Sequence, residues 1–271
     1  MPKAINTAVL QFFGIARLPF SKIHEANQTF ISSGFEEALA RLEFAVAEED
    51  FFLLTGAVGV GKSFVLNSLT SRLDPNCYTP IYIRGSHLSD GELYKAILAG
   101  LDRDPPRFSQ YAKRMYFSVL PELTRKPIAI IDDAQDLQDS ALTALKSMSN
   151  FGFDSQCKIA FILCGQPELR NRLKLSQFLP VLTRVRLAYH LKPMTLEETC
   201  RYIDHQTTAV GAPTPLFSDN AKADIHRRAE GIPRTVNAIC FRSMIAAAAD
   251  GLKVIDSSNL LFDGPIGEAE R

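Results

Sequence analysis

The strongest chemical signal in this sequence is the run from Gly56 to Ser63. It reads Gly-Ala-Val-Gly-Val-Gly-Lys-Ser and matches the phosphate-binding pattern G-x-x-x-x-G-K-[ST] at every fixed position. Apolar residues 51–54 precede it and the apolar-rich stretch 64–69 follows, so we expect it between a strand and a helix. Such a loop directs backbone N–H groups and the positive end of the helix at phosphates. The pattern predicts a nucleoside triphosphate site.

Each side chain of this loop has an expected role. Lys62 reaches the phosphates, and the Ser63 hydroxyl coordinates Mg²⁺. A purely structural glycine-rich turn is the competing interpretation, and the apolar flanks on both sides favour the nucleotide site. The predicted ATP-binding residues in and after the loop are Gly56, Val58, Gly59, Val60, Gly61, Lys62, Ser63 and Phe64.

A second element with catalytic chemistry lies further along the chain. The apolar stretch 127–131 ends in Asp132 and Asp133. A buried parallel strand would deliver these carboxylates to the sheet edge where the phosphate loop also lies. We expect Asp132 to hold the metal's water shell and Asp133 to orient the attacking water. Alone, the pattern is more often a strand running into a surface turn, and the phosphate loop favours the catalytic interpretation.

Composition excludes several classes of protein. A chain of 271 residues can form one large domain and a smaller one. Its formal charge is zero, so no global field draws it to nucleic acid or membrane. The five cysteines and five histidines are scattered, which predicts reduced thiols and no zinc site. We find no apolar stretch of about 18 residues and no secretory signal, and therefore expect a cytoplasmic protein without a membrane segment.

Strand and helix patterns alternate as far as residue 191. This alternation predicts an α/β fold, a parallel sheet with helices on both faces and ligands at the carboxyl ends of its strands. From residue 192 the pattern is helical only. The expected strands are 51–54, 80–83, 126–131, 159–163 and 185–191, and the clearest helices are 89–101, 108–125, 139–148 and 233–251.

Helix starts and domain boundaries follow from the same patterns. Capping boxes of the form S/T-x-x-E begin at Ser33, Ser89 and Thr195. We expect four segments: an N-terminal strap at 1–32, a nucleotide-binding domain at 33–191, an all-helical lid at 192–265 and a flexible C-terminus at 266–271.

Several blocks together are typical of one protein family. They include 12–14, 37–42, 133–137 and 191–198, and the most specific are Gly165-Gln166-Pro167-Glu168-Leu169 and Gly231-Ile232-Pro233-Arg234. With the phosphate loop, the acid-ended strand and the lid, they resemble AAA+ P-loop NTPases. In detail the sequence is similar to the ExeA/GspA-like group, which includes the TniB and TnsC ATPases of bacterial transposons. The resemblance covers nearly the whole chain.

The resemblance implies roles for further polar residues. Gln166, or the strand end before it, would be the first sensor of the γ-phosphate, with a helix N-cap as the alternative. Arg234 would be the second sensor, closing from the lid onto bound ATP, although an arginine in a first helical turn is usually solvated. Arg184 stands where a trans-acting arginine finger is expected, and Arg186 and Arg170 compete for that role.

Other positions are open or depart from the family pattern. Residues 18–20 would lie along the adenine, or form a strap packed on the core. Asp133 stands where a Glu is usual, which puts efficient water activation in doubt. Glu230 stands where a Gly is frequent, and Gly34-Phe35 stand where the secretion-type members often have a Ser-His pair.

We favour a regulator of DNA transposition as the function that this resemblance implies. Such an ATPase hydrolyses ATP slowly and in step with assembly. It forms a homo-oligomeric ring or helical filament on double-stranded DNA in the ATP state, independently of sequence, and recruits or activates a transposase. A mildly basic stretch at 84–126 could contact DNA phosphates, or could be a solvated helix face. Its interleaved residues are Arg103, Arg107, Phe108, Tyr111, Lys113, Arg114 and Tyr116.

Three other functions compete with transposition. An ExeA/GspA-like secretion ATPase is expected to continue past the lid into a transmembrane helix and a wall-binding domain, and this sequence contains neither. A helicase loader or replication-initiator-like switch is expected to carry a dedicated DNA-binding domain or a partner-binding extension. A small-molecule kinase is disfavoured by the arginine-bearing lid.

Overall fold

The computed structural model describes residues 2–20, 30–150 and 158–262. The chain divides into two units, one contiguous and one built from both ends. The first is Gly34–Lys192, and the second combines Met1–Ser33 with Pro193–Arg271. The N-terminal segment that we expected as a separate strap is thus grouped with the lid. The expected flexible C-terminus at 266–271 lies outside the described residues.

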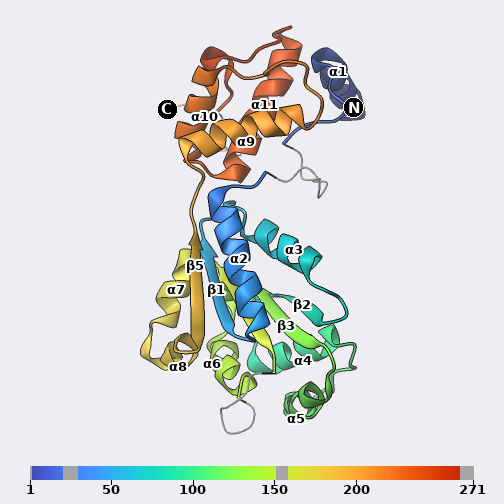
Figure 1. The fold of residues 1–271 in the computed structure, drawn as a ribbon, viewed down its shortest axis with the longest axis vertical. Helices are drawn as coiled ribbons and strands as arrows, with labels where there is room; N and C mark the ends of the chain where they lie inside the picture. Colours follow the sequence, from blue (N-terminus) through green and yellow to red (C-terminus); the bar gives the residue numbers. More distant parts are fainter. Residues whose placement is uncertain (1, 21–29, 151–157, 263–271) are drawn as a thin grey trace. The chain divides into compact units, whose positions relative to one another are not determined.

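A parallel sheet organises the contiguous unit (Figure 1). In the described part of the chain it has the strand order β2-β3-β4-β1-β5. Every neighbouring pair is parallel, so all carboxyl ends meet at one edge. The strands are β1 (Phe51–Gly56), β2 (Tyr78–Arg84), β3 (Lys126–Asp132), β4 (Ala160–Gly165) and β5 (Val185–Leu191).

Alternating side chains divide the core of this unit into two layers. Phe51 and Leu53 of β1 pack with the layer of α4–α8, whereas Phe52 and Leu54 pack with α2 and α3. This two-sided burial explains why the central strands are apolar throughout. The predicted α/β class with helices on both faces is confirmed. The helices are α2 (Ser33–Ala47), α3 (Lys62–Arg72), α4 (Asp90–Gly100), α5 (Ser109–Val119), α6 (Asp139–Met148), α7 (Pro167–Leu173) and α8 (Leu179–Leu182).

Two local predictions about helix ends are wrong. The helix expected to run to residue 125 ends at Val119, and a 3₁₀ turn containing Pro121 follows, because proline cannot donate to the preceding turn. Ser33 is the first residue of α2 and not its N-cap. Its N–H and hydroxyl donate to Glu198 Oε1 at 3.0 and 2.8 Å. The boxes at Ser89 and Thr195 are confirmed.

The second unit buries a core of its own. Its helices are α1 (Pro2–Phe13), α9 (Leu196–Thr208), α10 (Asp219–Ala229) and α11 (Pro233–Ala249). Val9 and Phe13 of α1 are buried with Ile203, Ile225 and Val236 in one cluster. None of the helices in the described ranges is both long enough and apolar enough to cross a membrane.

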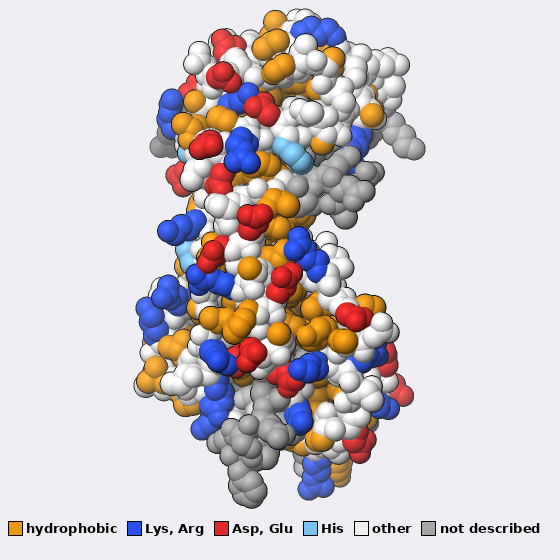
Figure 2. Space-filling model, in the orientation of Figure 1, with side chains coloured by type: hydrophobic (Ala, Val, Ile, Leu, Met, Phe, Trp, Pro, Cys, Tyr) orange, Lys and Arg blue, Asp and Glu red, His pale blue; other side chains and the backbone are white. Residues whose placement is uncertain are grey.

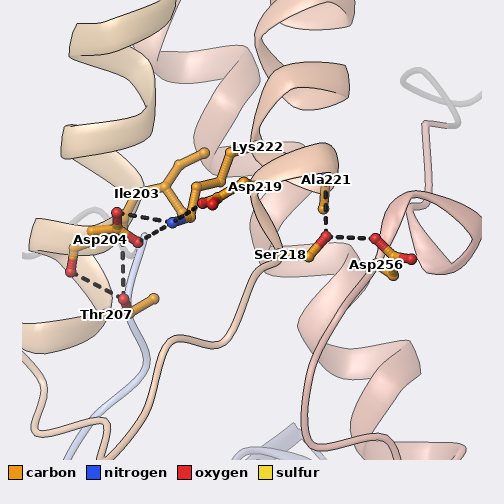
Figure 3. A network of polar contacts seen from close by, with 8 residues as sticks. All are labelled: Ile203, Asp204, Thr207, Ser218, Asp219, Ala221, Lys222 and Asp256. Atoms are coloured by element: carbon orange, nitrogen blue, oxygen red, sulfur yellow. Dashed lines mark hydrogen bonds and ion pairs between the residues drawn. The ribbon is translucent and has the colours of Figure 1, made fainter.

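A buried lysine ties α9 to α10 (Figure 3). Lys222 is 5% exposed, and its ammonium contacts the carboxylates of Asp204 at 2.7 Å and Asp219 at 3.2 Å. Burial opposes its charge, but these two hydrogen-bonded carboxylates outweigh burial and raise the pKa of Lys222. Nearby, the Ser218 hydroxyl accepts from the N–H of Ala221 at 3.1 Å and caps α10 (Figure 3).

The connection between α10 and α11 turns through two left-handed residues. Glu230 has φ 50° and Gly231 has φ 69°. A Cβ on Gly231 would lie 2.0 Å from the carbonyl oxygen of Met194, so only glycine fits there. At Glu230 the left-handed backbone is strained, which explains physically why glycine is frequent at this position of the family pattern.

Replacing Glu230 by Gly is therefore expected to stabilise this unit. Glu230→Gly removes the left-handed strain and should raise the free energy of unfolding by about 1 kcal/mol. Glu230→Ala is the matched control, because it removes the same side-chain charge but keeps the Cβ. Urea denaturation of both variants measures the effect. An equal gain in both would assign it to the charge and contradict the backbone explanation.

Candidate functional site

The predicted phosphate loop connects the end of β1 to the start of α3. Gly61 precedes the helix with φ 113°, a conformation that favours glycine. Lys62 is only 9% exposed, and its ammonium donates to the carbonyl oxygens of Gly56 at 2.8 Å and Ala57 at 3.0 Å. These acceptors are neutral, so the lysine charge and the helix N-terminus fit a polyphosphate.

Asp132 lies at the centre of the polar edge of the sheet. It ends β3 and is 6% exposed. Its Oδ2 accepts from the Ser63 hydroxyl at 3.2 Å, and its Oδ1 accepts from the N–H of Asp133 at 3.0 Å. The structure thus brings Ser63 and Asp132 together, as the sequence predicts. A hydroxyl and a carboxylate side by side are oxygen ligands suited to Mg²⁺ and its bound waters.

Tyr82 is a third donor to this carboxylate that the sequence analysis missed. Its hydroxyl donates to Asp132 Oδ2 at 2.9 Å from the neighbouring strand β2. Partial burial of that hydroxyl and the adjacent Asp132 charge raise the pKa of Tyr82 to about 12. Pairing of Arg84 with Asp132 in the β2–β3 register puts Tyr82 two residues before the strand end. That register is the signal that would have identified it.

Asp133 follows β3 in a left-handed conformation, with φ 52° and ψ 41°. The turn is closed by the N–H of Asp136, which donates to Asp133 O at 2.9 Å. Asp and Asn tolerate this conformation better than longer side chains do. The backbone therefore gives a physical reason for Asp where the family usually has Glu. One carboxylate oxygen accepts from Gln135 Nε2 at 3.3 Å.

The expected first sensor lies at the end of β4. Gln166 occupies the N-cap position of α7, but its side chain makes no capping hydrogen bond. Its backbone N–H instead donates to Gln135 Oε1 at 3.1 Å. Just before it, Cys164 is fully buried, and burial together with the Asp132 carboxylate raises the pKa of its thiol. The sensor role of Gln166 stays a prediction.

The three candidate finger arginines have different surroundings. Arg184 is held within its own unit, with hydrogen bonds to Ser149 Oγ, Asn150 Oδ1 and Pro180 O at 3.1, 2.6 and 2.9 Å. Arg186 forms an ion pair with Asp50 at 2.9 Å, and Arg170 is exposed on α7.

Two further predicted site residues belong to the second unit. Arg234 is exposed in the first turn of α11. Phe20, expected either along the adenine or in a packed strap, is 6% exposed and meets Phe217 edge-to-face at 6.1 Å. Within its own unit Phe20 therefore packs as part of the helical core.

Comparisons with known proteins show what the chain is similar to. Residues 46–173 match a family model described as an AAA domain. General secretion pathway protein A of Aeromonas hydrophila is 30% identical over 249 residues, which cover 89% of this chain. The match spans 45% of that relative, so the chain corresponds to less than half of its length.

Solved structures with the same fold include two archaeal proteins. Cdc6p from Pyrobaculum aerophilum has a TM-score of 0.70 at 19% identity, covering 87% of this chain and 67% of that one. The Aeropyrum pernix ORC1 protein, solved in complex with DNA, has a TM-score of 0.65 at 13% identity, covering 86% and 65%. The AAA match, this fold and the phosphate loop together show a P-loop ATPase domain of the AAA type that includes residues 46–173.

Nucleotide binding should depend on the Lys62 ammonium. Lys62→Ala is expected to weaken ATP binding by roughly a hundredfold or more, because charged hydrogen bonds of about 3 kcal/mol are lost from a buried cradle. Titration of a fluorescent ATP analogue measures the affinity, with the exposed Lys174→Ala as control. Parental affinity in Lys62→Ala would refute the assignment of the loop.

Asp133 should matter for hydrolysis and not for binding. Asp133→Asn is expected to lower turnover about a hundredfold or more while ATP affinity stays within about twofold, because only proton acceptance and water orientation are lost. Asp102→Asn is the matched control, since Asp102 is exposed and has the same left-handed backbone, with φ 56°. Parental turnover in Asp133→Asn would show that another group orients the water.

Proposed function

We propose that this chain is an ATP-driven assembly switch that regulates DNA transposition. It assembles on double-stranded DNA in the ATP state and recruits or activates a transposase. The observation that carries the nucleotide half is the meeting of Ser63 with Asp132 beside the buried Lys62. These groups lie at the carboxyl edge of a parallel sheet, where ligands of such folds bind.

The hydrolytic step uses groups from three neighbouring segments of this edge. Lys62 and the loop N–H groups bind the phosphates, and Asp133 orients the attacking water and takes its proton. Bound Mg²⁺, next to Ser63 and Asp132, would neutralise charge on the β- and γ-phosphates. Gln166 and Arg234 report the γ-phosphate in this proposal. The shorter Asp133 carboxylate supports slow turnover tied to assembly.

Assembly requires an arginine that reaches a second copy of the chain. Arg184 has intrachain partners at Ser149, Asn150 and Pro180 and must leave them to act across an interface. Arg170 is exposed on α7 and needs no such release. Arg184 remains the proposed finger in a ring or filament because of its place in the family pattern, and the exposed Arg170 is its competitor.

The DNA half is supported by one basic surface and by the likeness to the Aeropyrum pernix ORC1 protein, which was solved in complex with DNA. Arg103, Arg107, Lys113 and Arg114 are exposed on α5 and the loop before it, with Phe108 and Tyr111 beside them. Tyr116 does not belong to this surface, because it is buried and donates to Met148 O at 2.8 Å. Charges of both signs intermingle on the face drawn in Figure 2, so binding would rely on many copies acting together.

A secretion-associated ATPase is the second candidate. The Aeromonas hydrophila relative, named General secretion pathway protein A, favours it. The two candidate functions share the nucleotide chemistry. They differ in the partner of the assembled protein, which is DNA and a transposase in the first and a secretion system in the second. For the transposition regulator we propose the TniB/TnsC group, a transposase partner and a cytoplasmic location.

DNA binding should require ATP, ignore sequence and weaken steeply with salt, because the contacts are to phosphates. Gel shifts across a salt series, with a slowly hydrolysed ATP analogue, measure this. Replacing Lys113 and Arg114 by Ala should lower the slope of log affinity against log salt by about 2, or about 1 for each lost phosphate contact. Lys174→Ala serves as control. If the ATP-loaded chain has no affinity for DNA at low salt, the secretion-associated function replaces this proposal.

A further inference from the structure

Gln135 links two parts of the site that no sequence motif connects. It lies in the 3₁₀ turn Ala134–Asp136 that follows β3. Its Nε2 donates to Asp133 Oδ1 at 3.3 Å and to Asp136 Oδ2 at 3.4 Å. Its Oε1 accepts from the backbone N–H of Gln166 at 3.1 Å. One amide therefore bridges the end of β3 and the start of α7.

The chemistry of the partners fixes the orientation of this amide. A backbone N–H can only donate, so the side-chain oxygen must face Gln166. The NH₂ group is then directed at two carboxylates, which accept and cannot donate when ionised. Rotating the amide by half a turn would break all of these contacts. Gln135 thus holds Asp133 in a defined direction relative to α7.

The surroundings hold Gln135 in this place. The backbone carbonyl oxygen of Gln135 accepts from Arg172 Nη1 at 2.8 Å. Arg172 is also paired with Asp139 at the start of α6. A Cβ on Gly165 would lie 2.5 Å from Gln135 Oε1, so a larger residue there would displace the amide. The bridge is therefore supported from both its backbone and its side-chain end.

We propose that Gln135 is a positioning residue that makes Asp133 and the β4–α7 junction move as one. The proposal rests on the proposed role of Asp133. A shift of the Gln166 segment, on contact with bound nucleotide, pulls the Gln135 amide and turns the Asp133 carboxylate with it. Gln135 touches neither ATP nor water in this scheme, and it acts through Asp133.

Two substitutions separate the halves of the bridge. Gln135→Glu keeps an oxygen for the Gln166 N–H but presents a carboxylate to Asp133 instead of a donor. Gln135→Met keeps the length of the side chain and removes all three of its hydrogen bonds. Gln138→Met is the matched control, because Gln138 is exposed three residues on and its side chain makes no capping bond.

Hydrogen exchange in the nucleotide-free protein tests the link to Gln166. The backbone N–H of Gln166 should exchange about tenfold faster in Gln135→Met than in the parent. In Gln135→Glu and Gln138→Met it should exchange at nearly the parental rate. Parental protection in Gln135→Met would overturn the bridge. This readout does not depend on catalysis.

Turnover and affinity test the link to Asp133. Both Gln135 variants should lower turnover about tenfold with ATP affinity unchanged, because the acid is misdirected and the phosphate cradle is intact. In an Asp133→Asn background the same changes should have no further effect, since coupled residues are not additive. Losses that add in the double variants, or parental turnover in both single variants, would overturn the role of Gln135.

The two proposals fail in different ways. Parental turnover in Asp133→Asn refutes the role of Asp133 and with it the catalytic part of this inference. Reduced turnover in Asp133→Asn, with parental turnover in both Gln135 variants, refutes the positioning role alone.

Discussion

The buried carboxylate of Asp132 is the constraint around which the site is arranged. An ionised carboxylate taken out of water is strongly destabilising unless donors replace its hydration. Here the replacement comes from the Ser63 hydroxyl, the Tyr82 hydroxyl and the N–H of Asp133. Each donor comes from a different segment, so the charge is tolerated only when α3, β2 and the turn after β3 are all in place. Correct assembly of this edge and burial of its charge depend on each other.

The phosphate loop and Asp132 could be predicted from sequence because their positions depend on local rules. A glycine-rich turn between a strand and a helix, and acids at the end of an apolar strand, have defined places in a parallel sheet. Tyr82 could not be found in this way, because its contact depends on the register of two strands. Gln135 escaped prediction because its partners are a neighbouring acid and a backbone N–H on a segment after the next strand.

Contacts distant in sequence also explain why the predictions for Tyr116 and Ser33 were wrong. Tyr116 lies among basic residues in the sequence, yet its helical position turns it into the core. Ser33 matches a capping box, yet its donors are taken by Glu198, which also accepts from the N–H of Thr195 at 3.0 Å. In both cases a contact distant in sequence outcompeted the local pattern. Sequence patterns describe what a residue can do, and packing decides which option is used.

The helical unit is assembled from both ends of the chain, and this has a consequence for synthesis on the ribosome. The unit Gly34–Lys192 is contiguous and can fold as soon as it has emerged. Val9 and Phe13, in contrast, share a core with Ile225, Val236 and Ile255. These N-terminal apolar side chains must wait, uncovered, until the chain has been translated past Ile255. The phosphate loop and the carboxyl ends of the strands can thus be assembled in the nascent chain before its helical unit is complete.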